Sequence, residues 1–346
     1  MSEAITSREK SHPIVDITST AEFILGVQKD DGEIPWSMSG KTDPWDHVES
    51  AMGLAIGGFH DEAGKAYRWS SSVQLPDGSW WSSYRDGQPE ESAYKDSNMT
   101  AYIAVGVLHH YLVTADDQFL RLLWPTVQRA IDYVIKMQAE EGQILWAKRA
   151  DDSVSERALL TGSSSIYLSL TCALTIASLL GEKRPRWETA RVRLGEAIRH
   201  KPHLFDQSKA RYAMDWYYPV LCGAVRGKEA HERIRGSWDD FIIRGWGVRC
   251  VSDHQWVTVA ETSERVMALA AIGEFETAET VFGWIHDKKY EDGAFWTGVT
   301  SPEREIYPKE KTAWTAGSVL LAADLLYGLT PVNQIFSHSF WKPFPF

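Results

Sequence analysis

The chain has 346 residues, a formal net charge of −11 and a pI near 5.5. Because phosphate binding needs a concentrated basic surface, this balance argues against a nucleic acid or an anionic membrane as partner. The N-terminal stretch is polar and lacks the apolar core of a signal peptide, and no later segment reads as apolar over the length of a membrane helix, so we expect a cytoplasmic protein. Three widely spaced cysteines do not suggest a disulfide framework.

Four stretches along the chain repeat one pattern, in which a polar residue and an Asp-Gly or Glu-Gly pair precede a tryptophan. They read QKDDGEIPW, QLPDGSW, QAEEGQILW and KYEDGAFW, and they end at Trp36, Trp80, Trp146 and Trp296. Each follows an amphipathic run and precedes a run of small and apolar residues. Glycine tolerates the positive φ that ends many helices, so the pattern predicts a helix, a turn and a second helix.

The second run of each unit lacks a continuous charged face, which is typical of a buried helix. These runs begin at Asp46, Asp96, about Leu160, Asp215, Thr258 and Thr312. The first runs, such as 116–138 and 186–200, carry charges at helical spacing and belong outside. The repeat is too long for a short solenoid and fits six helical hairpins closed in a ring. We predict an all-α (α/α)6 toroid with almost no strand.

The toroid is predicted to form a single domain. Residues 1–14 are expected to be a flexible N-terminus, residues 15–330 the barrel, and residues 331–346 an aromatic tail packed on the barrel or on a partner. The tail is too aromatic to extend freely into water. The sequence leaves a monomer and a homodimer open.

Parallel inner helices would bring their N-termini, and the turns before them, to one mouth. Asp and Thr often cap helices, so an N-cap is the alternative reading of each acid there. Acids interleaved with Trp and Tyr nevertheless suit a sugar site, because glycoside hydrolysis takes two carboxyl groups. We predict Glu261, after the apolar WVTVA, as the acid, and Asp46, among polar neighbours, as the ionised base. The two roles can be exchanged, and Asp215 or Asp96 can replace one of them.

Aromatic rings stack on sugar C–H surfaces while acids and amides take the hydroxyls, although many tryptophans also simply fill cores. The predicted substrate-binding residues are Trp36, Trp45, Glu49, Trp80, Trp81, Asp96, Asn98, Asp215, Trp216, Tyr217, Trp256, Glu264, Trp296 and Trp314. No pattern typical of a zinc or calcium site occurs, and the predicted chemistry needs neither metal nor cofactor.

Two resemblances follow from these motifs. The QLPDGSW turns resemble the QW repeat of squalene-cyclase and prenyltransferase toroids, but the Asp-x-Asp-Asp and Asp-Asp-x-x-Asp motifs of terpenoid chemistry are absent. Residues 96–147 resemble six-hairpin glycosidases of the glucoamylase type. With LLTGSSSIY, AMDWYYPVL and AETSE, the whole chain is similar to bacterial (α/α)6 proteins, and that resemblance implies an endo-acting α-mannosidase.

The sequence therefore predicts a glycoside hydrolase, inverting, that cleaves an α-linked oligo- or polysaccharide. Inversion is favoured because wide funnels admit a water between the carboxyl groups, whereas retaining pairs lie about 5 Å apart. A terpenoid cyclase that steadies a carbocation on aromatic rings is one alternative. A non-catalytic glycan-binding barrel is another. A terpenoid enzyme should have a closed apolar cavity with one or two acids.

Overall fold

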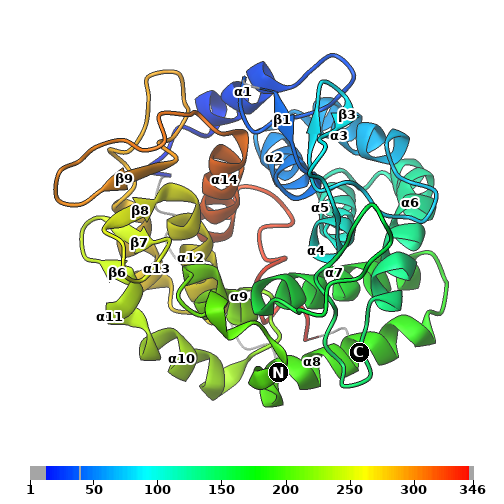
Figure 1. Cartoon of the computed structure of the whole chain (residues 1–346). Helices are drawn as coiled ribbons and strands as arrows, with labels where there is room; N and C mark the ends of the chain where they lie inside the picture. The colour runs from blue at the N-terminus through cyan, green and yellow to red at the C-terminus, as the bar shows by residue number, and fades with distance from the viewer. Residues whose placement is uncertain (1–12, 39, 343–346) are drawn as a thin grey trace, which may run out of the picture.

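Outer and inner helices alternate along the chain and form two concentric rings (Figure 1). The computed structural model describes residues 13–38 and 40–342, so the predicted flexible segment 1–14 lies almost wholly outside the described residues. The outer helices are α1 (Ile17–Val27), α3 (His60–Ser72), α6 (Asp117–Lys136), α8 (Pro185–His200), α10 (Gly227–Gly236) and α13 (Phe275–Gly283). The inner helices are α2 (Pro44–Ile56), α4 and α5 (Ser97–Ala101 and Ile103–Thr114), α7 (Leu160–Leu179), α9 (Ala213–Leu221), α12 (Val259–Ala271) and α14 (Ala313–Tyr327).

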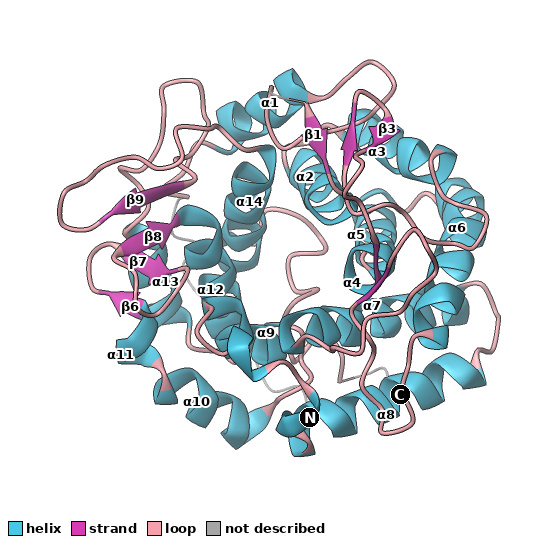
Figure 2. Cartoon of the chain, viewed as in Figure 1, coloured by secondary structure: helices cyan, strands magenta, loops and turns pink. Residues whose placement is uncertain are grey.

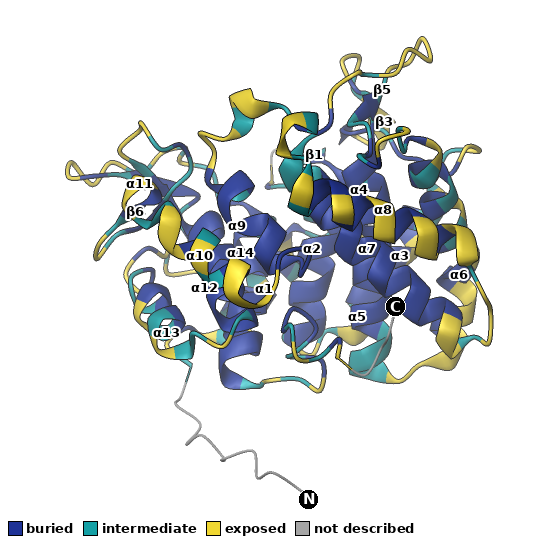
Figure 3. Cartoon of the chain, turned by 90° about the horizontal axis from the view of Figure 1, so that it is seen from below, coloured by how far each residue is buried: buried dark blue, intermediate teal, exposed yellow. Residues whose placement is uncertain are grey.

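The inner ring is closed. Each inner segment packs on the next, in the order α2, α5, α7, α9, α12 and α14, and α14 returns to α2. The inner helices are buried along most of their length, whereas α8 and α10 expose their outward faces (Figure 3). The predicted all-α (α/α)6 toroid is confirmed.

The repeated turns join neighbouring outer helices. The Gln74 amide after α3 donates to its own turn at Gly78 O and, at 3.0 Å, to Thr126 O of α6. Gly78 has φ +96°, and an added Cβ would lie 2.2 Å from Arg129 O of α6, so only glycine fits. Gln28 and Gln138 make the same link to α3 and α8. The repeated glutamine and glycine are thus structural.

The last turn closes the outer ring. Gly293, after α13, has φ +85°, and a Cβ there would lie 2.2 Å from Ser19 O of α1, the first outer helix. The first and last outer helices, α1 and α13, therefore meet through a turn glycine that lies against the next helix, as α3 and α6 do.

Short antiparallel strands gather at one end of the barrel (Figure 2). They form three small sheets in the orders β1-β2-β3, β4-β5 and β6-β7-β8-β9. Their bounds are Lys41–Thr42, Tyr84–Arg85, Gln88–Pro89, Lys95–Asp96, Ala147–Lys148, Ile242–Ile243, Gly247–Arg249, Trp256–Thr258 and Gly298–Thr300. Strands β1, β4 and β8 run directly into α2, α4 and α12, so they fix where these inner helices begin. We call this end the mouth.

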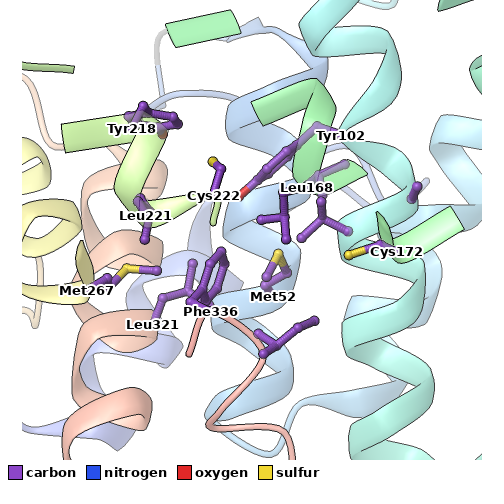
Figure 4. Packing of buried hydrophobic residues seen from close by; sticks show 14 of the residues in the cluster. Met52, Tyr102, Leu168, Cys172, Tyr218, Leu221, Cys222, Met267, Leu321 and Phe336 are labelled. Carbon is purple, nitrogen blue, oxygen red and sulfur yellow. The ribbon is translucent and has the colours of Figure 1, made fainter. Parts of the chain in front are cut away.

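The opposite end of the barrel is filled by apolar side chains. The residues nine positions after the N-caps of the inner helices are Met52, Val105, Leu168, Leu221, Met267 and Leu321, all buried. Phe336, from the segment after α14, packs among them (Figure 4). His338 of the same segment donates its backbone N–H to Ala271 O and bonds Val220 O through its ring at 2.7 Å. This end of the barrel is therefore closed by apolar packing.

One helix corrects the sequence-based expectation about membrane segments. Among the described residues, α7 is long and apolar enough to span a membrane by length and composition alone. Within this structure 89% of its apolar window is buried, since α7 packs between α5 and α9 in the inner ring and against α8 outside. Its apolar character is accounted for by this packing.

Candidate active site

Two inner helices place acids at matching positions. In α2, Asp46 and Glu49 lie three and six residues after the N-cap Asp43, and in α12, Glu261 and Glu264 lie three and six residues after the N-cap Thr258. No other inner helix carries an acid at both positions. Because residues three apart share a helix face, each helix presents one carboxyl group nearer the mouth and one a turn deeper.

The deeper positions form a polar layer across the barrel, which we call the floor. It comprises Glu49, Tyr102, Ser165, Tyr218, Glu264 and Ser318, each six residues after an N-cap. Figure 4 shows Tyr102 and Tyr218 above the apolar side chains that fill the opposite end of the barrel. The floor thus separates the mouth from the apolar end of the barrel.

Glu264 is the most heavily bonded acid of the floor. The Tyr218 hydroxyl donates to its Oε1 at 2.5 Å, and the Tyr217 hydroxyl donates to its Oε2. The side chain is buried, and this burial raises the pKa of Glu264 to about 8 despite the two tyrosine hydrogen bonds, which lower it. Glu264 therefore titrates near neutral pH.

Asp46 is half-buried at the first turn of α2. Burial and then the charges of Asp43 and Glu49 raise its pKa well above the usual range, and Glu264 adds to the effect. The prediction that polar neighbours keep Asp46 ionised was wrong in its reasoning, because those neighbours are themselves acids. A raised pKa instead makes Asp46 a stronger proton acceptor once it is ionised.

Hydrogen bonds orient both ends of this acid group. Asp43 caps α2 by accepting from the backbone N–H groups of Trp45 at 2.9 Å and Asp46 at 3.0 Å, and the Trp36 indole donates to its second oxygen. Glu261 is 7% exposed and accepts from the Thr258 hydroxyl. These contacts fix the direction of the Asp43 and Glu261 carboxyl groups.

An aromatic surface adjoins the acids. The ring centroid of the half-buried Trp45 lies 5.5 Å from that of Tyr102 and 5.7 Å from that of Tyr218, in tilted and edge-on orientations. Trp45 precedes Asp46 directly, so α2 places an indole beside a carboxyl group. Such a surface can pack against the C–H face of a sugar ring.

Several polar atoms of the inner helices are buried without a protein partner among the described residues. They include Asn98 Oδ1, Ser163 Oγ, Ser165 Oγ and Trp314 Nε1. All four belong to the first two turns of α4, α7 or α14. Buried polar groups are rarely left unsatisfied, so these atoms are candidates for binding the hydroxyl groups of a ligand.

Two acids predicted as alternatives serve the scaffold instead. Asp96 caps α4, with the backbone N–H of Asn98 at 2.8 Å, and the Trp146 indole donates to its other oxygen at 2.5 Å. Burial raises the pKa of Asp96 to about 6. Asp215 accepts from the backbone N–H of Thr161 at 3.1 Å and from its hydroxyl at 2.6 Å. Both acids thereby fix the start of an inner helix.

Three predicted stacking residues lie in the core. Trp80 is 2% exposed and donates to Ser70 O at 2.8 Å, while Trp216 is 4% exposed and stacks on Phe241. Their burial corrects the prediction that these two rings face a sugar. Tyr217 is fully buried as well, and it reaches the site through its hydrogen bond to Glu264.

Four more tryptophans are half-buried around the mouth, close to cations or backbone. Trp36 and Trp81 lie under Lys41 and Lys95, with the ammonium groups 4.1 and 5.3 Å from the ring centroids. Trp296 lies 5.3 Å from the Arg304 guanidinium, and Trp256 donates to Tyr307 O at 2.7 Å. These rings line the strands and loops rather than the floor.

The substrate-binding residues predicted from the sequence do not include Tyr102 and Tyr218. The signal was available, because Tyr102 and Tyr218 occupy the same position after their N-caps as Glu49 and Glu264 do. Aligning the six inner helices by their N-caps would have found the floor.

The helices form a closed ring, and acids and aromatic rings gather at the mouth. This is the architecture of a glycoside hydrolase. The chain is 48% identical over 317 residues to the MMP endo-(1,4)-3-O-methyl-α-D-mannosidase of Mycolicibacterium hassiacum, covering 92% of this chain and 88% of the relative. The protein therefore belongs to the family of this endo-mannosidase and is a glycosidase.

Solved structures share the fold. A wild-type glycosidase covers 91% of this chain and 96% of its own, with a TM-score of 0.72 at 15% identity. A sugar epimerase from a ruminal bacterium covers 88% and 95%, with a TM-score of 0.68 at 12% identity. No protein-family profile matches the chain. The comparisons support the resemblance to glycosidases. They give no support to the resemblance to prenyltransferases.

Proposed function

We propose that the protein is an inverting endo-α-mannosidase that cleaves (1,4)-linked chains containing 3-O-methylmannose. The single observation that carries the site assignment is the matched pair of acids on α2 and α12, at the mouth of a barrel whose other end is filled. The 48% identity to an enzyme named for that substrate supports the choice of sugar.

Asp46 and Glu261 are the proposed catalytic pair, with Asp46 as general base and Glu261 as general acid. They belong to helices that are separated in the inner ring by α14. A pair on non-adjacent helices suits the wider spacing of carboxyl groups that inversion requires. Burial and then the charges of Asp43 and Glu49 raise the pKa of Asp46, which makes its ionised form a stronger acceptor for the proton of the attacking water. Because the same shift favours the protonated form, the exchanged assignment, with Asp46 as acid and Glu261 as base, is the second candidate.

The floor and the aromatic surface supply binding in this proposal. A 3-O-methyl group cannot donate a hydrogen bond and adds apolar area, which suits the rings of Trp45, Tyr102 and Tyr218. The unpartnered atoms of Asn98 and Ser163 suit free hydroxyl groups.

The acid-rich site disfavours terpenoid chemistry. Five carboxyl groups, of Asp43, Asp46, Glu49, Glu261 and Glu264, adjoin one another around the mouth and floor. A carbocation enzyme would be expected to offer a closed apolar cavity with at most two acids.

The test is a time course on end-labelled (1,4)-linked α-oligomannosides, with and without 3-O-methyl groups, followed by mass spectrometry. The proposal expects early products of intermediate length from the methylated chain and slower cleavage of the unmethylated chain. Stepwise release of single sugars from one end would contradict the endo mode. Equal rates on both chains would contradict recognition of the methyl groups.

A further inference from the structure

Three arginines line one cavity that is separate from the proposed active site. The cavity has a volume of about 240 Å³ and lies between α7, α8 and the loop that joins α9 to α10. Its arginines are Arg191 and Arg199 of α8 and Arg226, the N-cap of α10. Among the described residues that line it, the only acid is Glu229. In a chain with a net charge of −11, this concentration of positive charge marks a candidate site for an anion.

Arg191 is held inside the protein by a tyrosine. It is 6% exposed, and its Nη1 donates to the Tyr167 hydroxyl of α7 at 3.2 Å. Its guanidinium carbon lies 5.4 Å from the centroid of the same ring. Burial lowers the pKa of Arg191, and the charge of Arg226 adds to this effect although Tyr167 opposes it. Because the Tyr167 hydroxyl accepts from Arg191 with its oxygen, it keeps a proton that it can donate to another acceptor.

Backbone carbonyl groups of one loop orient the other two arginines. The Nη1 of Arg199 donates to Ala224 O at 3.1 Å, and the Nε of Arg226 donates to Gly223 O at 2.7 Å. Glycines leave the space that these guanidinium groups occupy. A Cβ on Gly195 would lie 3.2 Å from Arg199 Nη1, and a Cβ on Gly223 would lie 3.0 Å from Arg226 Nη2. The two cations therefore lie directly against the backbone, in defined positions at the cavity wall.

The nearby acids neutralise only part of this charge. Glu196 pairs with Arg199 at 2.7 Å, and its side chain is 54% exposed. Within residues 13–38 and 40–342, neither Arg226 nor Glu229 forms an ion pair. The helix α10 begins beside Arg226 without a side-chain cap, so its partial positive end adds to the same region. The cavity thus offers positive charge and hydrogen-bond donors in excess of what the protein itself uses.

We propose that this cavity binds a phosphate group, either as free phosphate or in a small phosphate ester. Arginine matches phosphate because its planar N–H groups donate to two oxygens at once, and several arginines can balance a double negative charge. The volume exceeds that of a tetrahedral oxyanion but is smaller than the roughly 300 Å³ at which pockets for drug-sized ligands begin, which favours a small ligand over a nucleotide.

The site lies beside the segment that closes the barrel. Trp341 forms part of the cavity wall, and it belongs to the same segment after α14 as Phe336, which packs among the apolar side chains of the inner helices. The indole of Trp341 donates to Ile335 O at 2.9 Å, so it is fixed to that segment. A bound phosphate would therefore hold this segment, α8 and the start of α10 together.

The test is isothermal titration calorimetry of inorganic phosphate into the full chain, against chloride at matched ionic strength. Wild type should bind one phosphate. Arg199→Gln and Arg226→Gln should each weaken the affinity at least ~10-fold, because each removes a charged donor. Arg186→Gln removes an exposed arginine of α8 outside the cavity and should leave the affinity unchanged. No binding to wild type, or equal affinity in all three variants, would overturn the proposal.

Hydrogen exchange locates the bound anion. Phosphate should slow amide exchange in residues 223–229 and 335–342 and leave residues 43–49 at the mouth unchanged, whereas protection confined to the mouth would overturn the assignment. Arg226 is exposed, so Arg226→Gln should melt as wild type does in chloride and serves alone should Arg199→Gln fail to fold.

A second titration distinguishes the two sources of phosphate. Tighter binding of a hexose 6-phosphate, lost in Arg226→Gln, would identify an ester as the ligand. Equal or weaker binding of the ester would identify free phosphate. Neither result depends on mannosidase activity, so failure of the proposed function would leave this site to be judged separately.

Discussion

Replacing Glu264 with glutamine should make the protein more stable at high pH and less stable at low pH. Folding raises the pKa of this carboxyl group from 4.5 to about 8, so folding favours its protonated form. The corresponding stability is fully present below pH 4.5 and is lost as the pH rises through 8. The difference between the two pKa values corresponds to roughly 5 kcal/mol.

Glutamine removes this titration but also removes one acceptor. Its single oxygen can accept from only one of Tyr217 and Tyr218, which costs about 1 kcal/mol at any pH. The variant should therefore be about 1 kcal/mol less stable than wild type well below pH 4.5, about as stable at pH 5, where the unfolded carboxyl group is already largely ionised, and up to ~4 kcal/mol more stable at pH 9.

Urea unfolding at pH 5, 7 and 9 measures this crossing of the two stability curves. Glu156→Gln is the matched control, since Glu156 is exposed, and its curve should follow wild type throughout. Parallel curves for Glu264→Gln and wild type would refute the claim that the folded protein holds Glu264 protonated near neutral pH.

Two further pairs of variants test the fold and the site separately. Gly78→Ala forces a Cβ to within 2.2 Å of Arg129 O and should lower the free energy of unfolding in urea by at least ~3 kcal/mol. Gly181 also has a positive φ but open space around it, so Gly181→Ala should lower this free energy by about 1 kcal/mol. Equal losses in the two variants would contradict the tight approach of the turns. Trp80→Phe should lower stability by ~1 to 2 kcal/mol and leave kcat/KM unchanged, because the ring is in the core. Trp45→Ala should instead lower kcat/KM at least tenfold, and the opposite pattern would remove Trp45 from the site.

The fold could be predicted from the sequence because the repeated residues are those that shape the backbone of the turns. A glycine in the turn after four of the outer helices, and a glutamine before three of these glycines, predicted the helix–turn–helix unit. The same residues make the contacts between outer helices, as Gln74 and Gly78 show. The tryptophan of the repeat was misassigned because its direction depends on the turn. Trp80 folds back onto Ser70 of its own hairpin, and no periodicity encodes that return.

The site was accessible in part. Asp46 and Glu261 were predicted because acids cluster at the starts of buried helices, where few acids belong. Their surroundings were harder to predict, since neighbours in sequence and neighbours in space differ. Glu264 lies on α12, yet it raises the pKa of Asp46 on α2. Reasoning that considers only the neighbours of Asp46 along the chain misses such contacts between helices.

The most direct test of the central claim is proton NMR of the anomeric signals released from a methylated α-oligomannoside, with Asp46→Asn and Glu261→Gln measured beside wild type. The account predicts that the β anomer appears first and that each variant loses at least 10³-fold in kcat, because both carboxyl groups take part in one displacement. Initial release of the α anomer would contradict inversion. Near-wild-type activity in either variant would contradict the assignment of that carboxyl group.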